Sequence, residues 1–135
     1  MSNYGMDIRL KGGLEGAKVK VVEALKAQGF GVLTEIDVQK TLKQKIGVDF
    51  KPYLILGACN PHLAQRALST DESIGLLLPC NVVLKGAGDD VEVSILDPEA
   101  MFSIADPETR NALAGLPQEA KSRLQAALAA LEMIS

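Results

Sequence analysis

Tyr53-Leu-Ile-Leu-Gly-Ala-Cys-Asn-Pro61 is the most informative segment of the chain. Its first four residues form an unbroken apolar run, which is typical of a strand buried on both faces near the middle of a sheet. Asn60 is a favourable helix N-cap, and Pro61 suits the first helical position because the N–H it lacks would have no partner there. The segment therefore predicts a strand followed directly by a helix, whose inner stripe is Leu63, Ala64, Ala67 and Leu68.

Two further strand–helix pairs precede this segment. Strands are predicted over residues 4–10 and 30–36, where β-forming residues cluster. Gly29 ends the helix between them, and Asp37 is the expected N-cap of a second, short helix that ends at Gly47. The helix before Gly29 is indicated by apolar residues at helical spacing, Leu14, Ala17, Val21 and Leu25.

The second half of the chain predicts a hairpin and then helices. Residues 74–78 and 81–85 resemble one strand bent at Pro79, and residues 91–96 alternate as its antiparallel partner across the turn at 86–90. Asp97-Pro98 and Asp106-Pro107 resemble helix starts. A long amphipathic helix follows, with the apolar stripe Leu116, Ala120, Leu124, Ala127 and Leu131. We expect one α+β domain over residues 1–135, with two layers, one mixed and largely antiparallel sheet, and helices mainly on one face.

Composition narrows the range of partners. Seventeen acidic and fourteen basic residues give a net charge of −3, without the basic stripe that nucleic-acid binding requires. No apolar run approaches the roughly twenty residues needed to cross a membrane, and residues 1–7 lack the features of a secretory signal. We therefore expect a soluble cytoplasmic protein with reduced cysteines, and neither nucleic acid nor a membrane as partner.

Cys59 and Cys80 are the strongest candidates for chemistry. Cys59 lies at the carboxyl end of the predicted strand, where the positive end of the following helix would lower the pKa of its thiol if the sulfur faced free amides. Cys80 has a similar context, since each cysteine is followed by asparagine. If their strands are neighbours, both sulfurs could share one site with Asn60 and Asn81. The alternative is that both cysteines are small core residues, the commonest role of free cysteine.

His62, the only histidine, offers a second kind of site. It stands three residues after Cys59, so that Cys59, His62 and Cys80 could supply three ligands to a metal or haem and leave one position open. The alternative is a solvated surface histidine. Alternation would point Glu35 and Asp37 the same way, as an acid–base pair needs, although helix capping already explains Asp37. For Asp97, Glu99 and Asp106, which lie at helix starts, capping outweighs catalysis. No motif requires a cofactor, because Gly86-x-Gly88 is too short for a phosphate fingerprint.

Three segments carry a family resemblance: Gly29-Phe-Gly-Val-Leu-Thr-Glu-Ile36, Tyr53–Pro61 and Leu77-Leu-Pro-Cys-Asn-Val82. They resemble the domain of unknown function 302 family, from about Leu14 to the C-terminal helix. The resemblance implies a two-layer fold of the TATA-binding-protein-like class, with homodimers among its members and no established activity. The cysteines of the family's pattern correspond to Cys59 and Cys80, whereas His62 is outside that pattern. We do not transfer DNA binding, because function resides in sites and this chain is acidic.

These observations leave three hypotheses for function, and whether the protein is an enzyme stays open. The first is a small ligand-binding or thiol-redox module, capable of carrying sulfur as a persulfide, with Cys59 as reactive thiol and Cys80 as its partner. The second is a noncatalytic homodimerisation or interaction domain with structural cysteines. The third is an open Cys/His metal or haem site.

Overall fold

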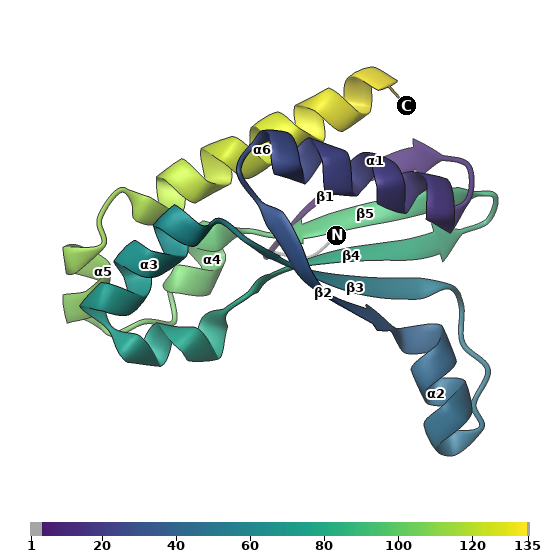
Figure 1. Ribbon diagram of the computed structural model, residues 1–135, viewed down its shortest axis with the longest axis horizontal. Coiled ribbons are helices and arrows are strands. Elements are labelled where there is room, and N and C mark those ends of the chain that lie inside the picture. The colour runs from purple at the N-terminus through teal and green to yellow at the C-terminus, as the bar shows by residue number, and fades with distance from the viewer. Residues whose placement is uncertain (1–3, 135) are drawn as a thin grey trace.

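A five-stranded antiparallel sheet with helices on one face forms the fold (Figure 1). The structure is a computed structural model that describes residues 4–134. The strands lie in the order β1-β5-β4-β3-β2, and every neighbouring pair is antiparallel. The predicted two-layer α+β fold is thereby confirmed, and the sheet is antiparallel throughout its described strands rather than mixed. The strands are β1 (Gly5–Lys11), β2 (Gly31–Asp37), β3 (Tyr53–Cys59), β4 (Cys80–Ala87) and β5 (Asp90–Leu96).

The helical layer lies above the sheet in Figure 1, with α1 and α6 side by side across it. Alternation along β3 turns Leu54, Leu56 and Ala58 into the core, opposite Leu84, Val82 and Cys80 of β4. All five residues of the stripe predicted for the last helix are buried there. The helices are α1 (Leu14–Ala27), α2 (Val38–Ile46), α3 (Pro61–Thr70), the 3-10 helix η1 (Glu72–Leu77), α4 (Pro98–Phe102), α5 (Pro107–Ala112) and α6 (Leu116–Ile134).

The opposite face of the sheet is open. Tyr53 and Ile55 on β3 and Val83 on β4 point away from the helical layer and stay partly exposed. The prediction that residues 53–56 are buried on both faces is therefore wrong, because the helices cover only one side. β3 is an inner strand, but β4 occupies the middle of the sheet.

Local sequence signals explain most of the helix boundaries. The side chain of Asp37 accepts a hydrogen bond from the Lys40 amide and starts α2, and Gly47 ends that helix in the left-handed conformation at φ 68°. Asp97 caps α4 in the same way by accepting from the Glu99 amide. Pro107 begins α5 as predicted, although the side chain of Asp106 makes no capping hydrogen bond.

The segment before β4 differs from the prediction. Residues 72–77 form η1 rather than a strand, and β4 begins only at Cys80. Asp71 is the N-cap of η1, since its carboxylate accepts from the Ser73 amide at 3.0 Å, and it also accepts from the Thr109 hydroxyl of α5 at 2.8 Å. The predicted hairpin is confirmed, since β4 and β5 pair across a turn at Gly88, which has a φ of 65°. Among residues 4–134, no helix is long and apolar enough to span a membrane.

Candidate functional site

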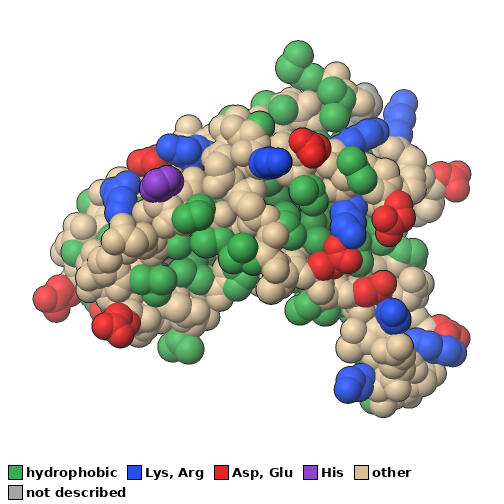
Figure 2. Space-filling model, in the orientation of Figure 1, with side chains coloured by type: hydrophobic (Ala, Val, Ile, Leu, Met, Phe, Trp, Pro, Cys, Tyr) green, Lys and Arg blue, Asp and Glu red, His purple; other side chains and the backbone are tan. Residues whose placement is uncertain are grey.

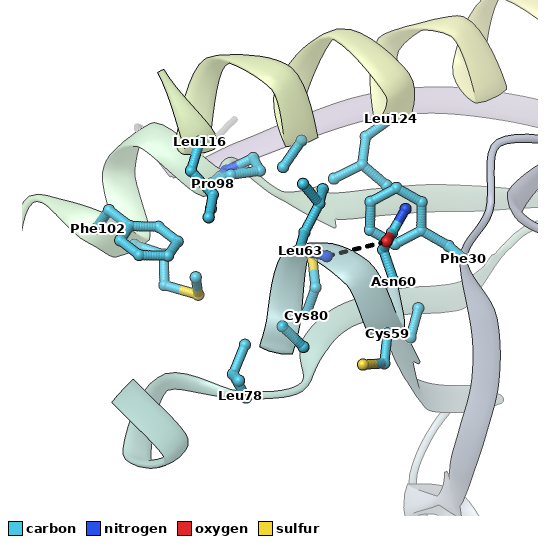
Figure 3. A pocket seen from close by; sticks show the side chains of 14 residues that line it. Phe30, Cys59, Asn60, Leu63, Leu78, Cys80, Pro98, Phe102, Leu116 and Leu124 are labelled. Carbon is cyan, nitrogen blue, oxygen red and sulfur yellow. Dashed lines mark hydrogen bonds between the residues drawn. The ribbon is translucent and has the colours of Figure 1, made fainter. Parts of the chain in front are cut away.

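The two cysteines lie at adjacent ends of neighbouring strands. Cys59 is the last residue of β3, and Cys80, the first residue of β4, pairs with Ala58. Consecutive side chains on a strand point to opposite faces of the sheet. The side chain of Cys80 therefore lies on the core face with that of Ala58, whereas the side chain of Cys59 points to the open face. Figure 3 shows the two sulfurs pointing in opposite directions. Both cysteines are free thiols. The backbones come together as predicted, but the sulfurs do not converge.

Both residues nevertheless border one cavity of about 50 Å³ between the sheet and the helices (Figure 3). The core face of β3 and β4 forms its floor, while α3, α4 and α6 form its walls. Leu78 and Met101 separate this cavity from a larger external groove, because both residues line both spaces. The inner cavity is lined by Phe30, Ala58, Cys59, Asn60, Leu63, Ala64, Leu78, Cys80, Pro98, Met101, Phe102, Leu116, Ala120 and Leu124.

Cys80 is a buried thiol with a satisfied donor. Only 9% of the residue is exposed, and its Sγ donates to the carbonyl oxygen of Leu96 at 3.7 Å. Burial raises the pKa of this thiol to about 12, because the thiolate would lose its hydration. Cys80 is therefore protonated at neutral pH, which is the form that suits an apolar wall.

Cys59 is less buried, but its thiol is not activated either. Burial raises the pKa of this thiol above its ordinary value, and the condition for a lowered pKa, a sulfur facing free amides, is not met. The first turn of α3 has no spare amide to offer a thiolate. Pro61 has no N–H, the amides of His62 and Leu63 donate to Asn60 Oδ1 at 3.1 and 3.2 Å, and the Ala64 amide donates to the Asn60 carbonyl oxygen. The capping side chain occupies the donors that a thiolate would need.

The two asparagines have different surroundings. Asn60 is 5% exposed and borders the cavity, but its side-chain oxygen is engaged as the N-cap of α3. Asn81 is exposed on the open face of the sheet, where it pairs with Gly57 and lines the external groove. The structure thus gathers Cys59, Asn60 and Cys80 around one space and leaves Asn81 outside it.

His62 lies exposed at the start of α3, and the purple side chain in Figure 2 marks it at the surface. Within residues 4–134, no three or more His, Cys, Asp or Glu side chains are close enough to hold a metal ion. The hypothesised set of Cys59, His62 and Cys80 is therefore not gathered as three ligands of one metal ion. The carboxylates have structural partners, since Glu35 forms an ion pair with Lys18 and Asp37 caps α2.

The comparisons with known proteins give the chain its family. The model of the family described as "Domain of unknown function DUF302" matches residues 6–131. The chain belongs to the DUF302 family. Among solved structures, it is similar to the crystal structure of the uncharacterized conserved protein DUF302 from Bacillus stearothermophilus, with 28% identity and a TM-score of 0.81. The alignment covers 94% of this chain and 97% of that one. The search of curated proteins gave no match.

The segments that carry the DUF302 resemblance have clear roles in folding. A Cβ atom at Gly57 would lie 2.2 Å from Thr34 Oγ1 and 2.8 Å from Pro79 Cγ, so only glycine allows this close approach. Asn60 and Pro61 start α3, and Cys80 fills the core beside the cavity. Packing and helix capping are therefore sufficient to explain these residue types, and no catalytic role is needed.

Sequence analysis missed most of the cavity wall in this DUF302 chain. Met101 and Phe102 come from α4, whose start was predicted at Asp97-Pro98, and Leu78 comes from the segment misread as strand. Apolar residues of this kind give no functional signal in a sequence, because the same residue types occupy ordinary core positions. Only the packing of α4 against α6 shows that they enclose a space.

Proposed function

We propose that this DUF302 chain is a binding module that holds a small apolar molecule in the cavity beside Cys80, with its cysteines as lining groups. The supporting observation is the chemistry of the wall. Carbon and sulfur atoms dominate it, and Asn60, the one amide side chain among its described residues, uses its oxygen to cap α3. Within residues 4–134, no buried side-chain nitrogen or oxygen lacks a hydrogen-bond partner. A ligand without hydrogen-bonding groups matches this lining best.

The size of the cavity restricts the ligand. Its volume of about 50 Å³ is far below the roughly 300 Å³ at which sites for drug-sized molecules begin. A molecule of a few non-hydrogen atoms matches this space. Larger apolar ligands require the wall to move, and Met101 has the flexible thioether chain that allows such movement. Met101 and Leu78 are therefore the expected entrance.

The thiol-redox and persulfide forms of this function have weaker support. Nucleophilic sulfur chemistry needs a thiolate, and burial raises the pKa of both thiols. A partner reaction between Cys59 and Cys80 also needs their sulfurs on one side, whereas strand alternation sends them to opposite faces. The geometry thus favours passive binding over sulfur transfer.

The experiment tests the proposal by enlarging a side chain of α6 so that it occupies part of the cavity. Ala120 lines the cavity and is buried, whereas Ala130 on the same helix is exposed. Ala120→Val and Ala130→Val carry the same cost in helix propensity, so they form a matched pair. Xenon under pressure, followed through the methyl NMR signals of Met101 and Leu63, should perturb wild type and Ala130→Val and leave Ala120→Val unaffected. The proposal is wrong if xenon perturbs none of the three proteins, or perturbs all three alike.

A noncatalytic interaction domain is the second candidate function. It is favoured by two large apolar side chains that the fold leaves in solvent side by side, Leu76 at 88% and Ile104 at 73% exposed, which line the same external groove. Isolated exposed apolar residues are normal, but clustered ones mark interaction sites.

A further inference from the structure

A further hollow lies at the surface where α4, α5 and the beginning of α6 meet. Figure 1 shows these three segments together at one end of the molecule. We call this space the α4–α6 hollow. Its volume of about 410 Å³ lies within the range of sites for small organic molecules. It is separate from the external groove, because none of the described residues lines both spaces.

The α4–α6 hollow combines an apolar floor with a polar rim. Phe102 and Leu113 are buried and Pro117 is half-buried, so carbon atoms form the floor. Arg110 and Gln118 belong to the rim, where their side chains are exposed. Ligand sites typically have this composition, in which an apolar surface covers most of the ligand and a few polar groups orient it.

Arg110 brings a positive charge to the rim without a carboxylate partner. The chain has four arginines, and the other three, Arg9, Arg66 and Arg123, each form an ion pair with a carboxylate. Arg110 forms no ion pair within residues 4–134, although Asp106 lies four residues before it, at a spacing that suits a helical pair. A guanidinium binds a carboxylate through two parallel N–H···O bonds. Arg110 is therefore available to a carboxylate from outside the chain.

The other charged group in the lining, Glu99, is already engaged. Its Oε1 lies 3.1 Å from Lys121 Nζ, and its Oε2 accepts a hydrogen bond from Gln118 Nε2 at 3.4 Å. The negative charge of Glu99 is thus offset from α6, whereas the positive charge of Arg110 is not offset. The α4–α6 hollow consequently favours an anionic ligand over a neutral or a cationic one.

The apolar floor restricts the ligand further. An inorganic anion bound to Arg110 would leave the carbon surfaces of Phe102 and Pro117 in water. A ligand with a flat apolar body beside its anionic group would cover these surfaces, and the removal of apolar area from water stabilises the complex. The aromatic ring of Phe102 also suits stacking against a second ring.

We propose that the α4–α6 hollow is a binding site for a small aromatic carboxylate, in which Arg110 pairs with the carboxylate and Phe102 and Pro117 contact the ring. The site is distinct from the inner cavity, since Phe102 is the single described residue that lines both spaces. This inference does not depend on a guest in the inner cavity.

The experiment compares three probes that share a ring and differ in charge, which are benzoate, benzyl alcohol and benzylammonium. Titration of wild type, followed through the backbone amide NMR signals of Ser103 and Gln118, should give saturable shifts with benzoate. The other two probes should bind about tenfold more weakly, because they lose the charge-assisted hydrogen bonds to Arg110. Arg110→Gln should weaken benzoate binding by about the same factor. Lys20→Gln on α1 is the control, since it removes an exposed positive charge and no ion pair of the described residues.

The outcomes separate a built site from a general effect of charge or folding. Arg110 is exposed, so Arg110→Gln should keep the wild-type unfolding midpoint. The comparison of the three probes uses wild type alone and therefore tests the proposal however the variant folds. The absence of saturable shifts up to about 10 mM benzoate, a range that detects millimolar affinity, overturns the proposal. Equal affinity for the three probes overturns it too, as does an equal loss of benzoate affinity in Arg110→Gln and Lys20→Gln.

Discussion

At the residue scale, Gly57 shows how close packing accounts for part of the family pattern. The rigid ring of Pro79 and the hydroxyl of Thr34 occupy the position of the missing side chain. Gly57→Ala should lower the free energy of unfolding by about 1–3 kcal/mol, the usual cost of overpacking. Gly31→Ala in β2 is the control, since its Cβ atom would meet nothing within 4 Å. Urea unfolding of both variants measures the difference, and equal losses at the two positions would contradict this account.

The cysteines provide a second prediction at this scale. A raised pKa leaves less thiolate at neutral pH in the folded protein than in the unfolded chain, and burial slows access further. Both thiols should therefore react with a chromogenic disulfide reagent more slowly in native protein than in 6 M guanidinium, and Cys80 should react more slowly than Cys59. The variants Cys59→Ala and Cys80→Ala separate the two rates. Faster reaction in the native protein would restore the redox hypothesis.

The same residues show what sequence could predict about the site. Asn60 and Pro61 were recognised as a helix start because capping depends on local geometry. The pKa of Cys59 could not be predicted, because it depends on whether the cap leaves amides free and on how deeply the strand end is buried. The direction of each sulfur depends on the strand register, in which Cys80 pairs with Ala58 rather than with Cys59.

At the element scale, the carboxylates of Asp71 and Asp97 connect short helices to neighbouring elements through hydrogen bonds. Hydrogen bonds from Ser73 and Thr109 hold the pKa of Asp71 below its usual range and join η1 to α5. Burial raises the pKa of Asp97, but hydrogen bonds from Lys121 and from the Glu99 amide outweigh it, so the net pKa is lowered. These bonds connect short elements that have little core of their own.

The pH dependence of stability follows from these lowered pKa values. Asp71 and Asp97 take up protons at a higher pH in the unfolded chain than in the folded protein. The stabilisation from their ionised carboxylates is therefore complete above the carboxyl pKa of the unfolded chain, about 3.9. It is lost as the pH falls through the folded value. Asp97→Asn should be less stable than wild type at pH 7 and should lose less stability between about pH 5 and pH 2. Thermal unfolding across this pH range is the measurement, and Asp89→Asn in the exposed hairpin turn is the control. If the unfolding midpoints of wild type and Asp97→Asn fall in parallel as the pH is lowered, the prediction is wrong.

Residues 74–78 show why one element was misassigned. Their apolar sequence fits a short strand as well as it fits a 3-10 helix, because periodicity has little power over five residues. Asp71 caps η1 by accepting from the Ser73 amide, and its other partner, Thr109, lies 38 residues away in the sequence. The second of these contacts leaves no trace in a local pattern. The hairpin of β4 and β5, in contrast, was predictable because its turn and its alternation are both local.

At the scale of the whole molecule, sequence patterns predicted the fold class, the order of most elements and the packing of α6, all of which depend on apolar periodicity. They did not predict the open face. The apolar run Tyr53–Leu56 indicated burial on both sides, whereas half of it faces outward in the single chain. Tyr53 and Ile55 share that outer face with charged residues such as Lys85 and Glu92, which form an ion pair across β4 and β5. A short apolar run in the sequence does not record which face of the strand the helices cover.

Leu78 and Met101 stand between the inner cavity and the external groove, and each touches both spaces. A molecule bound in the groove would press on the outer surface of the two side chains past which a guest reaches the cavity. Occupancy of one space would therefore change the affinity of the other, by the same factor in both directions.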